Sequence, residues 1–600
     1  MLHVKLVKNT IGHLLLYRVK SDPSNFAIGT IQDGLIQKTT FEQYKKMIEG
    51  ISLALAKNGL MPQDKVGILS ETRIEWNVFD LATMASGGVT VPIYHTYRPE
   101  EVKFILLQTQ TKILAVEDES QLLKVSEIIG ELPDLKTIIT FEKITTELIS
   151  KFDDSINIVS FKDLTELGVQ ELISNPDVFD TKIMETHENN IATIVYTSGT
   201  TGEPKGAVIS HGALVAMLSN IKSFAKASLT KNDISLVFLP LSHVLGRCDS
   251  LLNLNFGCLT VYAESIDRLL GNISLVRPTF MIAVPRIFEK IYEKVQKDLE
   301  SSGIVKRSLF NWAMDCTNNY YAKIEKDKTP DTLEIIQFNL AKKLVTDKIY
   351  QKFGGRIRYF ISGGAPISKE IISFLRNSGL TLIEGYGLTE TIAPCVLNPF
   401  EKQRGGTVGK PVGDVEVKFL EDGEILIRSK ALFREYYLNP EETEKSLDAE
   451  GWFKTGDLGS FDDNGYLEIT GRKKDIIITS GGKNIAPQKI ENILKLCSSI
   501  NQVIVVGDKQ KYLGALITVD KASFNIEKWS EITKEKEKEV TDFIQNAIDN
   551  MNESLANYET IKRFKLLKME LTTDNYLTPS LKVKKKLMIK DFSEDINSMY

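Results

Sequence analysis

The stretch Tyr196–Ala207, with the sequence YTSGTTGEPKGA, combines hydroxyl, glycine and lysine residues in a spacing that suits phosphate binding. Hydroxyls can donate to phosphate oxygens, glycines let backbone N–H groups approach closely, and a lysine supplies a cation. The residues concerned are Thr197, Ser198, Gly199, Thr200, Thr201, Gly202, Lys205 and Gly206. No Gly-Lys-[Ser/Thr] follows at the required spacing, so the stretch is not a Walker loop. The spacing favours phosphate binding over the alternative, a flexible connector rich in serine, glycine and threonine.

Short apolar runs that alternate with amphipathic stretches lead up to this loop. The pattern predicts helices over residues 74–85 and 99–108, set between strands at 65–70, 89–94, 112–118 and 136–141. Strands that alternate with helices of this length form βαβ units in a largely parallel sheet. The alternation resumes at 191–195, 356–362 and 380–384. No Gly-x-Gly-x-x-Gly follows the first strand, so a dinucleotide-binding fold is not indicated.

The second half of the chain contains two regions of different character. Residues 295–350 are polar with helical spacing, which predicts a helical excursion from the sheet. After Gly471, strands are predicted at 475–479, 502–506 and 515–519, and the charged run 534–539 is expected to be a solvated helix face. We therefore predict an α/β protein: a large N-terminal domain, 1–473, of stacked, mostly parallel βα sheets, and a small mobile α+β domain, 474–600.

Composition limits the function classes. The chain has 600 residues, 26% charged and 42% hydrophobic, and a formal charge of −5, which gives no general attraction to nucleic acid. Its 5 cysteines lie far apart, so a zinc site or a disulfide framework is not indicated and a reducing compartment is expected. No secretory signal and no run of 18 apolar residues is evident. These features predict a cytoplasmic protein.

Six segments, in one order, resemble the motifs of the adenylate-forming superfamily, which includes acyl-CoA synthetases, luciferases and peptide-synthetase adenylation domains. After the loop come SGGAP at 362–366, EGYGLTE at 384–390, GWFKTGDLG at 451–459, GRKKDIIITSGGKNIAP at 471–487 and LTPSLKVKK at 577–585. The helical excursion and the segments 70–97, 239–247 and 277–295 are similar to those of long-chain fatty acid–CoA ligases. The resemblance implies that a fatty acid and ATP form an acyl-adenylate and pyrophosphate, and that coenzyme A then displaces AMP.

The resemblance also implies roles for residues that bind ATP and Mg²⁺. Lys205 and the loop hydroxyls would hold the β- and γ-phosphates, and Glu390 would hold Mg²⁺ together with Thr197. Tyr386 would stack on adenine, while Asp457 would accept hydrogen bonds from the ribose hydroxyls beside Arg472. The remaining ATP-binding positions are Gly363, Gly364, Ala365, Pro366, Gly385, Gly387 and Thr389.

The last two motifs imply residues for the two half-reactions. Lys582 matches the lysine that neutralises the carboxylate and the α-phosphate during adenylation, and Lys474 matches the hinge about which the small domain rotates. The narrow tunnel for the CoA thiol would be lined by Ser480, Gly481, Gly482 and Lys483. The lysines that follow the adenylation lysine, Lys584, Lys585 and Lys586, are expected to be solvated.

His243, in LSHVLG, lies where the family places an aromatic residue or histidine near the substrate carboxylate, although a histidine between apolar residues is more often a core group. Three positions depart from the long-chain pattern. Ser580 replaces a threonine and keeps the hydroxyl, and Lys585 replaces an arginine and loses the bidentate fork. Gly246 stands where a glutamate often precedes the arginine, which leaves the acyl site undefined.

Two other functions stay open. A fatty acyl-AMP ligase or acyl-carrier-protein synthetase would share the adenylation residues, but the hinge motif and the SGGKN stretch favour CoA as acceptor. A non-catalytic nucleotide- or lipid-binding protein would not need Lys582, Glu390 and Lys205, all of which are present. Peripheral membrane contact is compatible with a fatty acid substrate, although no amphipathic anchor demands it. Acyl length and oligomeric state are not predicted.

Overall fold

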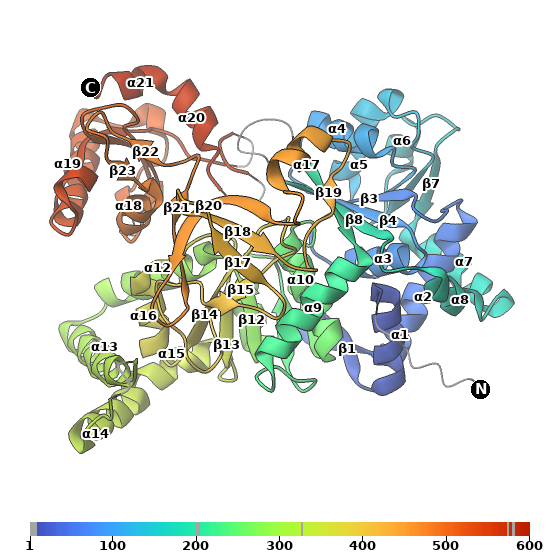
Figure 1. Cartoon of the computed structure of the whole chain (residues 1–600), viewed down its shortest axis with the longest axis horizontal. Helices are drawn as coiled ribbons and strands as arrows, with labels where there is room; N and C mark the ends of the chain where they lie inside the picture. Colours follow the sequence, from blue (N-terminus) through green and yellow to red (C-terminus); the bar gives the residue numbers. More distant parts are fainter. Residues whose placement is uncertain (1–8, 198–203, 326–327, 498, 573–574, 579–581) are drawn as a thin grey trace.

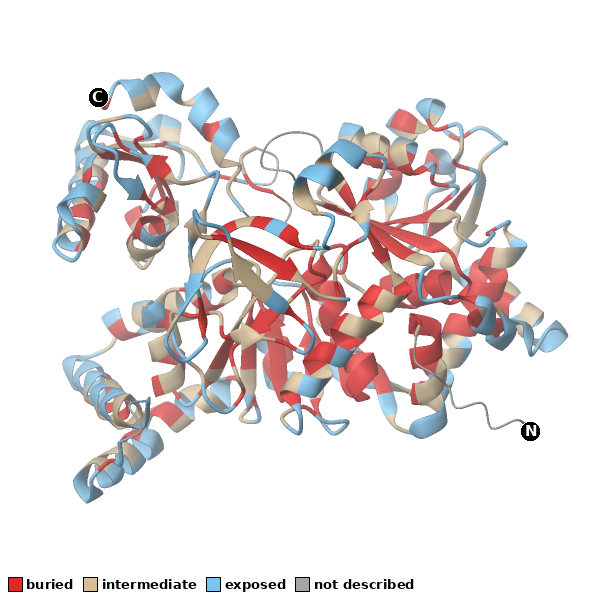
Figure 2. Cartoon of the chain, in the orientation of Figure 1, coloured by how far each residue is buried: buried red, intermediate tan, exposed pale blue. Residues whose placement is uncertain are grey.

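A computed structural model describes residues 9–197, 204–325, 328–497, 499–572, 575–578 and 582–600. Figure 1 shows a large body built around two sheets, with a smaller C-terminal unit beside it that carries α18–α21. The buried residues concentrate in the large body (Figure 2). The predicted fold class is confirmed.

The first sheet has the strand order β19-β9-β8-β4-β3-β5-β6-β7. From β8 to β7 neighbouring strands are parallel, whereas β9 pairs antiparallel with β8 and with β19. Its helices α3 (Ile74–Ala85) and α4 (Pro99–Thr109) agree closely with the prediction. The strands are β3 Lys65–Leu69, β4 Val89–Ile93, β5 Ile113–Val116, β6 Thr137–Thr140, β7 Asn157–Ser160, β8 Ile191–Thr197, β9 Lys205–Ser210 and β19 Glu435–Tyr436.

The second sheet has the order β16-β15-β14-β13-β12-β10-β11-β1-β2. Its edge is an N-terminal hairpin that the sequence analysis did not predict, because β1 pairs with β11, where Ile28 faces Thr260, far along the chain. The strands are β1 Phe26–Gln32, β2 Leu35–Thr40, β10 Ile234–Val237, β11 Leu259–Tyr262, β12 Phe280–Ala283, β13 Tyr359–Ser362, β14 Thr381–Tyr386, β15 Val396–Leu397 and β16 Lys410–Pro411.

One continuous core joins the two sheets through α1 (Ile11–Ser21), α2 (Phe41–Lys57), α3, α9 (His211–Ala225) and α10 (Val244–Phe256). Every residue of α10 is buried, which is typical of a central helix. Its Arg247 forms a buried ion pair with Asp80 of α3, with Nε–Oδ2 at 3.0 Å and Nη2–Oδ1 at 2.5 Å. This pairing satisfies the two charges that the apolar core would otherwise exclude.

The region predicted as a helical excursion is helical in the structure, and its helices begin before residue 295. It consists of α12 Pro285–Glu300, α13 Ile304–Glu325, α14 Thr332–Ala341, the π-helical turn η2 Lys342–Thr346 and α15 Asp347–Lys352. Helices α13 and α14 extend from one end of the large body (Figure 1). The other helices of the large body are α5 Glu119–Ile128, α6 Thr146–Ile149, α7 Phe161–Ser174, α8 Val178–Glu185, α11 Leu269–Val276, α16 Lys369–Asn377 and α17 Pro440–Ser446. Within the described ranges, no helix has both the length and the apolar character that crossing a membrane requires.

An antiparallel sheet, β17-β18-β20-β21, leads from the large body to the C-terminal unit. Its strands are β17 Glu416–Phe419, β18 Glu424–Arg428, β20 Phe453–Phe461 and β21 Leu467–Arg472. The C-terminal unit has a separate apolar core. Its strands and helices are β22 Ile477–Ile478, β23 Asn484–Ile485, α18 Pro487–Leu494, β24 Ile500–Val506, β25 Leu513–Val519, α19 Lys534–Asn552, β26 Ile561–Leu566, α20 Lys585–Asp591 and α21 Ser593–Asn597. The predicted strand over 475–479 is shorter than expected, because the N–H groups of Asp475 and Ile476 both donate to the Arg472 carbonyl and form a turn.

Candidate functional site

Three residues of separate motifs meet in one hydrogen-bonded set. Tyr386, at the end of β14, donates from its hydroxyl to Oδ2 of Asp457 at 2.7 Å. Arg472, at the end of β21, places Nε 3.2 Å from Oδ1 of the same carboxylate. Burial raises the pKa of Asp457, while the Arg472 charge and the Tyr386 hydrogen bond oppose that shift. The sequence predicted all three residues, but it did not predict that Tyr386 contacts Asp457.

Lys582 approaches this set from the C-terminal unit. Its backbone is held by Thr578, whose N–H donates to the Lys582 carbonyl at 2.7 Å and whose Oγ1 accepts from the Lys582 N–H at 3.0 Å. Surrounding protein and the Arg472 charge lower the pKa of the Lys582 ammonium, and the Asp457 charge opposes them. The side chain nevertheless keeps access to solvent. The structure therefore brings Lys582 into electrostatic contact with two residues of the large body.

An ion pair anchors the segment that carries Lys582. Nζ of Lys585 lies 2.9 and 2.8 Å from the two carboxylate oxygens of Glu491, on α18. Glu491 is only 4% exposed and also accepts from the Val505 N–H at 3.0 Å. The expectation that Lys585 is solvated is therefore wrong. Its partner lies 94 residues away, and no local pattern marks such a pairing.

His243 caps α10 at its N-terminus. Its Nδ1 accepts from the Leu245 N–H at 3.1 Å, so a neutral ring carries its proton on Nε2. Burial and the nearby Lys582 charge lower the pKa of His243 to about 4. The next glycine, Gly246, has no space for a side chain, because a Cβ there would lie 2.4 Å from the Pro240 carbonyl oxygen. The departure at Gly246 thus reflects tight packing at the start of this helix.

The ends of the phosphate loop lie beside Glu390. Thr197 and Lys205 face each other across β8 and β9, and the Thr197 hydroxyl donates to the Lys205 carbonyl at 3.3 Å. Nζ of Lys205 pairs with Glu442 and lies 5.5 Å from the ring centroid of Tyr436. The Tyr436 hydroxyl donates to Oε1 of Glu390 at 2.6 Å. The predicted loop residues Ser198, Gly199, Thr200, Thr201 and Gly202, like Ser580, lie outside the described residues.

Tyr436 and Glu442 were missed by the sequence analysis. Tyr436 belongs to β19, which pairs with β9 at Ala207, and therefore reaches the loop through a sheet contact. Neither residue lies in one of the six motifs. The only local signal is the helix start Asn439-Pro440, whose Asn439 side chain accepts from the Glu442 N–H at 3.1 Å and so positions that residue.

The motifs SGGAP (362–366) and EGYGLTE (384–390) begin on neighbouring parallel strands, since Ser362 of β13 pairs with Glu384 of β14. Gly387 allows a close backbone approach there, because a Cβ would lie 2.2 Å from the Ala393 carbonyl oxygen. The following predicted positions therefore lie at or just after the carboxyl ends of these two strands: Gly363, Gly364, Ala365, Pro366, Gly385, Tyr386, Gly387 and Thr389.

The predicted hinge and thiol-tunnel residues are exposed. Lys474 follows Lys473, which is held by Asp422 and Glu424 at 2.5 and 2.8 Å. The turn that contains Ser480, Gly481, Gly482 and Lys483 joins β22 to β23. It contacts its own unit: the Ser480 N–H donates to the Gln510 carbonyl at 2.9 Å, and Nζ of Lys483 lies 5.4 Å from the Tyr558 ring centroid. In this structure the C-terminal unit presents Lys582, and not this turn, to the Asp457 set.

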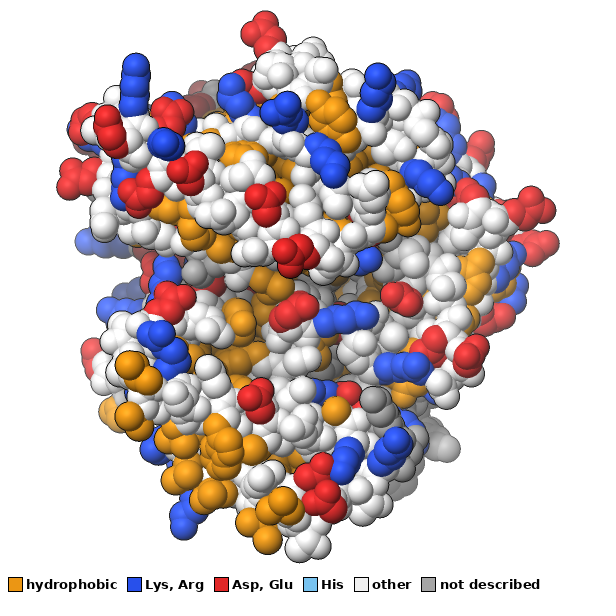
Figure 3. Space-filling view, turned by 90° about the vertical axis from the view of Figure 1, so that its left-hand side faces the viewer, with side chains coloured by type: hydrophobic (Ala, Val, Ile, Leu, Met, Phe, Trp, Pro, Cys, Tyr) orange, Lys and Arg blue, Asp and Glu red, His pale blue; other side chains and the backbone are white. Residues whose placement is uncertain are grey.

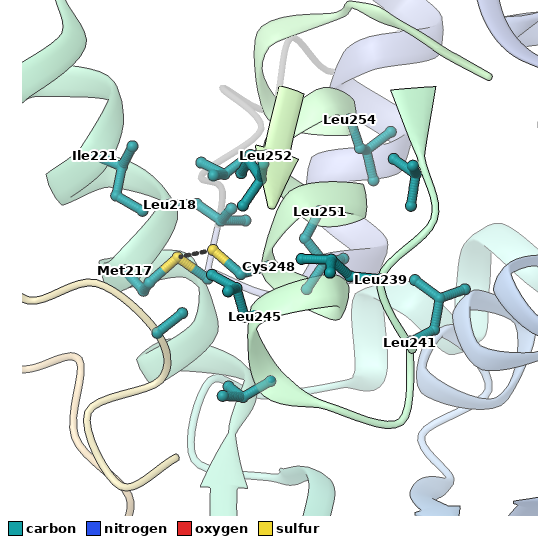
Figure 4. Packing of buried hydrophobic residues seen from close by; sticks show 14 of the residues in the cluster. Met217, Leu218, Ile221, Leu239, Leu241, Leu245, Cys248, Leu251, Leu252 and Leu254 are labelled. Carbon is teal, nitrogen blue, oxygen red and sulfur yellow. Dashed lines mark hydrogen bonds between the residues drawn. The ribbon is translucent and has the colours of Figure 1, made fainter. Parts of the chain in front are cut away.

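The apolar region beside the loop strands is closely packed. Figure 4 shows Met217 of α9 against Cys248 of α10, with the two sulfur atoms 3.6 Å apart, among leucine side chains. A cavity there has a volume of about 10 Å³, close to what one water molecule needs. Its lining includes Val195, Met217, Val244, Cys248, Leu251 and Ile392. Among the described residues, no group of three or more His, Cys, Asp or Glu side chains could hold a metal ion.

Two family models match the chain. The model described as "AMP-binding enzyme" matches residues 18–437, and "AMP-binding enzyme C-terminal domain" matches residues 474–600. The long-chain-fatty-acid–CoA ligase FadD15 of Mycobacterium tuberculosis is 32% identical, covering 99% of this chain and 97% of its own length. The peroxisomal long chain acyl-CoA synthetase 7 of Arabidopsis thaliana is 30% identical, covering 98% of this chain and 86% of its own.

Solved structures share the fold. The adenylation domain of a carboxylate reductase from Mycobacterium chelonae superposes with a TM-score of 0.78 at 21% identity, covering 98% of this chain and 91% of that chain. The anthranilate CoA ligase AuaEII, solved with anthranoyl-AMP, gives a TM-score of 0.74 at 19% identity, with all of both chains covered. At these identities the likeness concerns the fold alone.

Proposed function

This chain belongs to the AMP-binding enzyme family, and from that premise we propose that it is an AMP-forming long-chain fatty acid–CoA ligase. It would convert ATP, a fatty acid and CoA into acyl-CoA, AMP and pyrophosphate through an acyl-adenylate. The relatives that match nearly the whole chain support the substrate class. The observation that carries the proposal is the position of Lys582 beside the Tyr386–Asp457–Arg472 set.

The first half-reaction needs cations more than it needs a base. A carboxylate oxygen attacks the α-phosphorus of ATP, and the bond from that phosphorus to the pyrophosphate oxygen breaks. Two anions must approach each other, so a cation between them stabilises the transition state. We assign this role to Lys582. The neutral His243, with its proton on Nε2, can donate a hydrogen bond to the fatty acid carboxylate.

Adenosine recognition falls to the set around Asp457. A carboxylate can accept about four hydrogen bonds, and the interactions with Tyr386 and Arg472 account for one at each oxygen of Asp457. The remaining lone pairs can accept from the ribose hydroxyls. Because its hydroxyl is tied to Asp457, the Tyr386 ring has a defined orientation against which adenine can stack.

The triphosphate would lie between the loop ends and Glu390. Lys205 can exchange its pairing with Glu442 for the phosphates, and the hydrogen bond from Tyr436 fixes the Glu390 carboxylate. The oxygen donors of Glu390 and Thr197 suit Mg²⁺, which binds oxygen ligands. When bound, this ion supplies charge neutralisation for the phosphates.

Thioester formation would use the other face of the C-terminal unit. We propose that the unit rotates about Lys474, so that Lys582 withdraws and the turn 480–483 approaches the acyl-adenylate. Two glycines in that turn leave room for a narrow thiol. The CoA sulfur then attacks the acyl carbon, and the bond from that carbon to the AMP oxygen breaks. We place the reaction in the cytoplasm, with peripheral contact to a membrane as the source of the fatty acid.

Release of AMP from Mg-ATP and a C16 fatty acid, measured with and without CoA, tests the proposal. Sustained AMP release only with CoA, together with acyl-CoA formation, is the expected result. Acyl-AMP that CoA does not discharge would instead indicate a carrier-protein acceptor. Absence of AMP with acids of every length tested would contradict ligase activity.

A further inference from the structure

Helix α14 has the composition of a buried helix but lies at the surface. Six of its ten residues, TLEIIQFNLA, are apolar. Leu333, Ile336 and Leu340 are 63%, 58% and 47% exposed, and Leu344 in the following turn is 37% exposed. Their spacing of three and four residues places them along one side of the helix. An exposed apolar stripe of this kind indicates a surface that contacts another apolar phase.

The stripe is held outward by packing on its opposite side. The Phe338 ring stacks on Tyr320 of α13 with centroids 4.0 Å apart, and it meets Tyr321 edge-on at 5.6 Å. Lys323 of α13 pairs with Glu334 of α14 at 2.5 Å. These contacts fix the rotation of α14 about its axis, so its exposed side chains are a stable feature of the fold.

Basic residues accompany the stripe. Residues 304–352 contain nine basic and six acidic residues, a charge of +3, in a chain whose total charge is −5. Lys342 and Lys343 are exposed, and in the sequence they stand between Leu340 and Leu344. Figure 3, which faces the side carrying α13 and α14, shows hydrophobic side chains gathered in its lower part with lysine and arginine side chains nearby. Apolar residues bordered by lysines are typical of helices that lie in the interface of an anionic bilayer.

We propose that the stripe formed by Leu333, Ile336, Leu340 and Leu344, with Lys342 and Lys343, docks this protein on an anionic lipid surface. The apolar side chains enter the boundary between headgroups and acyl chains, and the lysines contact lipid phosphates. A second copy of the chain would bring the same positive charges together, which disfavours self-association through this face. The choice of a bilayer also rests on the proposed function, since a long-chain fatty acid partitions into membranes.

Co-sedimentation of the full-length protein with lipid vesicles tests the proposal. Wild type is expected to bind vesicles of phosphatidylglycerol and phosphatidylcholine more tightly than vesicles of phosphatidylcholine alone. Burial of one large aliphatic side chain is worth about tenfold or more in a partition equilibrium, so Ile336→Asp/Leu340→Asp should weaken vesicle binding by at least about tenfold. Lys342→Gln/Lys343→Gln should remove the preference for anionic vesicles.

A matched control lies on α7, where Val169 and Ile173 have the same four-residue spacing and are 52% and 80% exposed. Val169→Asp/Ile173→Asp should bind vesicles as wild type does. The proposal is overturned if wild type does not bind vesicles, if the α14 and α7 variants bind equally, or if the α14 variant instead dissociates a dimer. AMP release with Mg-ATP, CoA and fatty acids of several lengths, measured in vesicle-free buffer, separates the two hypotheses. The α14 variant should retain the wild-type rate, whereas absence of release in wild type with every acid tested would contradict only the proposed function.

Discussion

Replacing Lys585 by methionine should destabilise the C-terminal unit, because it leaves the buried Glu491 carboxylate without its cation. Removing one partner of a buried ion pair costs about 3–5 kcal/mol. The side chains of Glu491 and Lys585 are 5% and 24% exposed, so solvent reaches the lysine end. Glu491 also keeps the hydrogen bond from Val505. We therefore expect about 3 kcal/mol, the lower end of that range.

The same substitution should slow adenylation. Lys585 is the first residue of α20 and lies three positions after Lys582, so its ion pair fixes the segment that presents Lys582 to Asp457. Acyl-AMP formation should fall in Lys585→Met, while thioester formation from supplied acyl-AMP should fall less. Lys585→Arg retains a cation that can pair with Glu491 and should restore acyl-AMP formation.

Hydrogen exchange of the β24 and β25 amides, which belong to the core of the C-terminal unit, measures the stability change. Lys586→Met is the matched control, because Lys586 is exposed and its loss should change stability by no more than about 0.5 kcal/mol. Equal exchange rates in the Lys585→Met and Lys586→Met variants would refute the reasoning. A normal adenylation rate in a destabilised Lys585→Met variant would refute the positioning role alone.

Substitutions at three further positions test other parts of the molecule. Lys582→Ala should reduce adenylation by about 10²–10³-fold, by analogy with removal of one electrostatic stabiliser, and spare thioester formation from supplied acyl-AMP; equal loss of both half-reactions would count against it. Because the pKa of Lys582 is lowered, its charge and hence adenylation should be lost at a lower pH than for an ordinary lysine, and Lys582→Arg should move this alkaline limit upward. Lys474→Pro should impair thioester formation more than adenylation, a prediction that unchanged overall turnover would contradict. Asp80→Asn should lower the free energy of unfolding by about 3–5 kcal/mol, since it leaves the buried Arg247 charge unbalanced; urea denaturation showing a loss below about 1 kcal/mol would disprove this.

The local hydrophobic pattern was sufficient to predict the strands and helices whose burial leaves a regular pattern in the sequence. The alternation of apolar strands and amphipathic helices predicted β3, α3 and β4 to within a residue or so, because burial of both sheet faces imposes that pattern on the chain itself. The ordered motifs identified the family, which the matching models confirm over residues 18–437 and 474–600. The roles of the site residues and the domain boundary at 473–474 stay predictions.

Residue types and their order along the chain thus determined the fold class, the family and the candidates Lys205, Glu390 and Lys582. Tertiary structure alone decided which distant residues meet: Tyr436 and Glu442 at the loop, Glu491 beneath Lys585, and β1 beside β11. Each of these contacts joins segments far apart in sequence. The free energy of these contacts depends on burial and geometry that exist only after the sheets and the C-terminal unit have packed. The local spacing of residues along the chain therefore does not predict which of these residues meet.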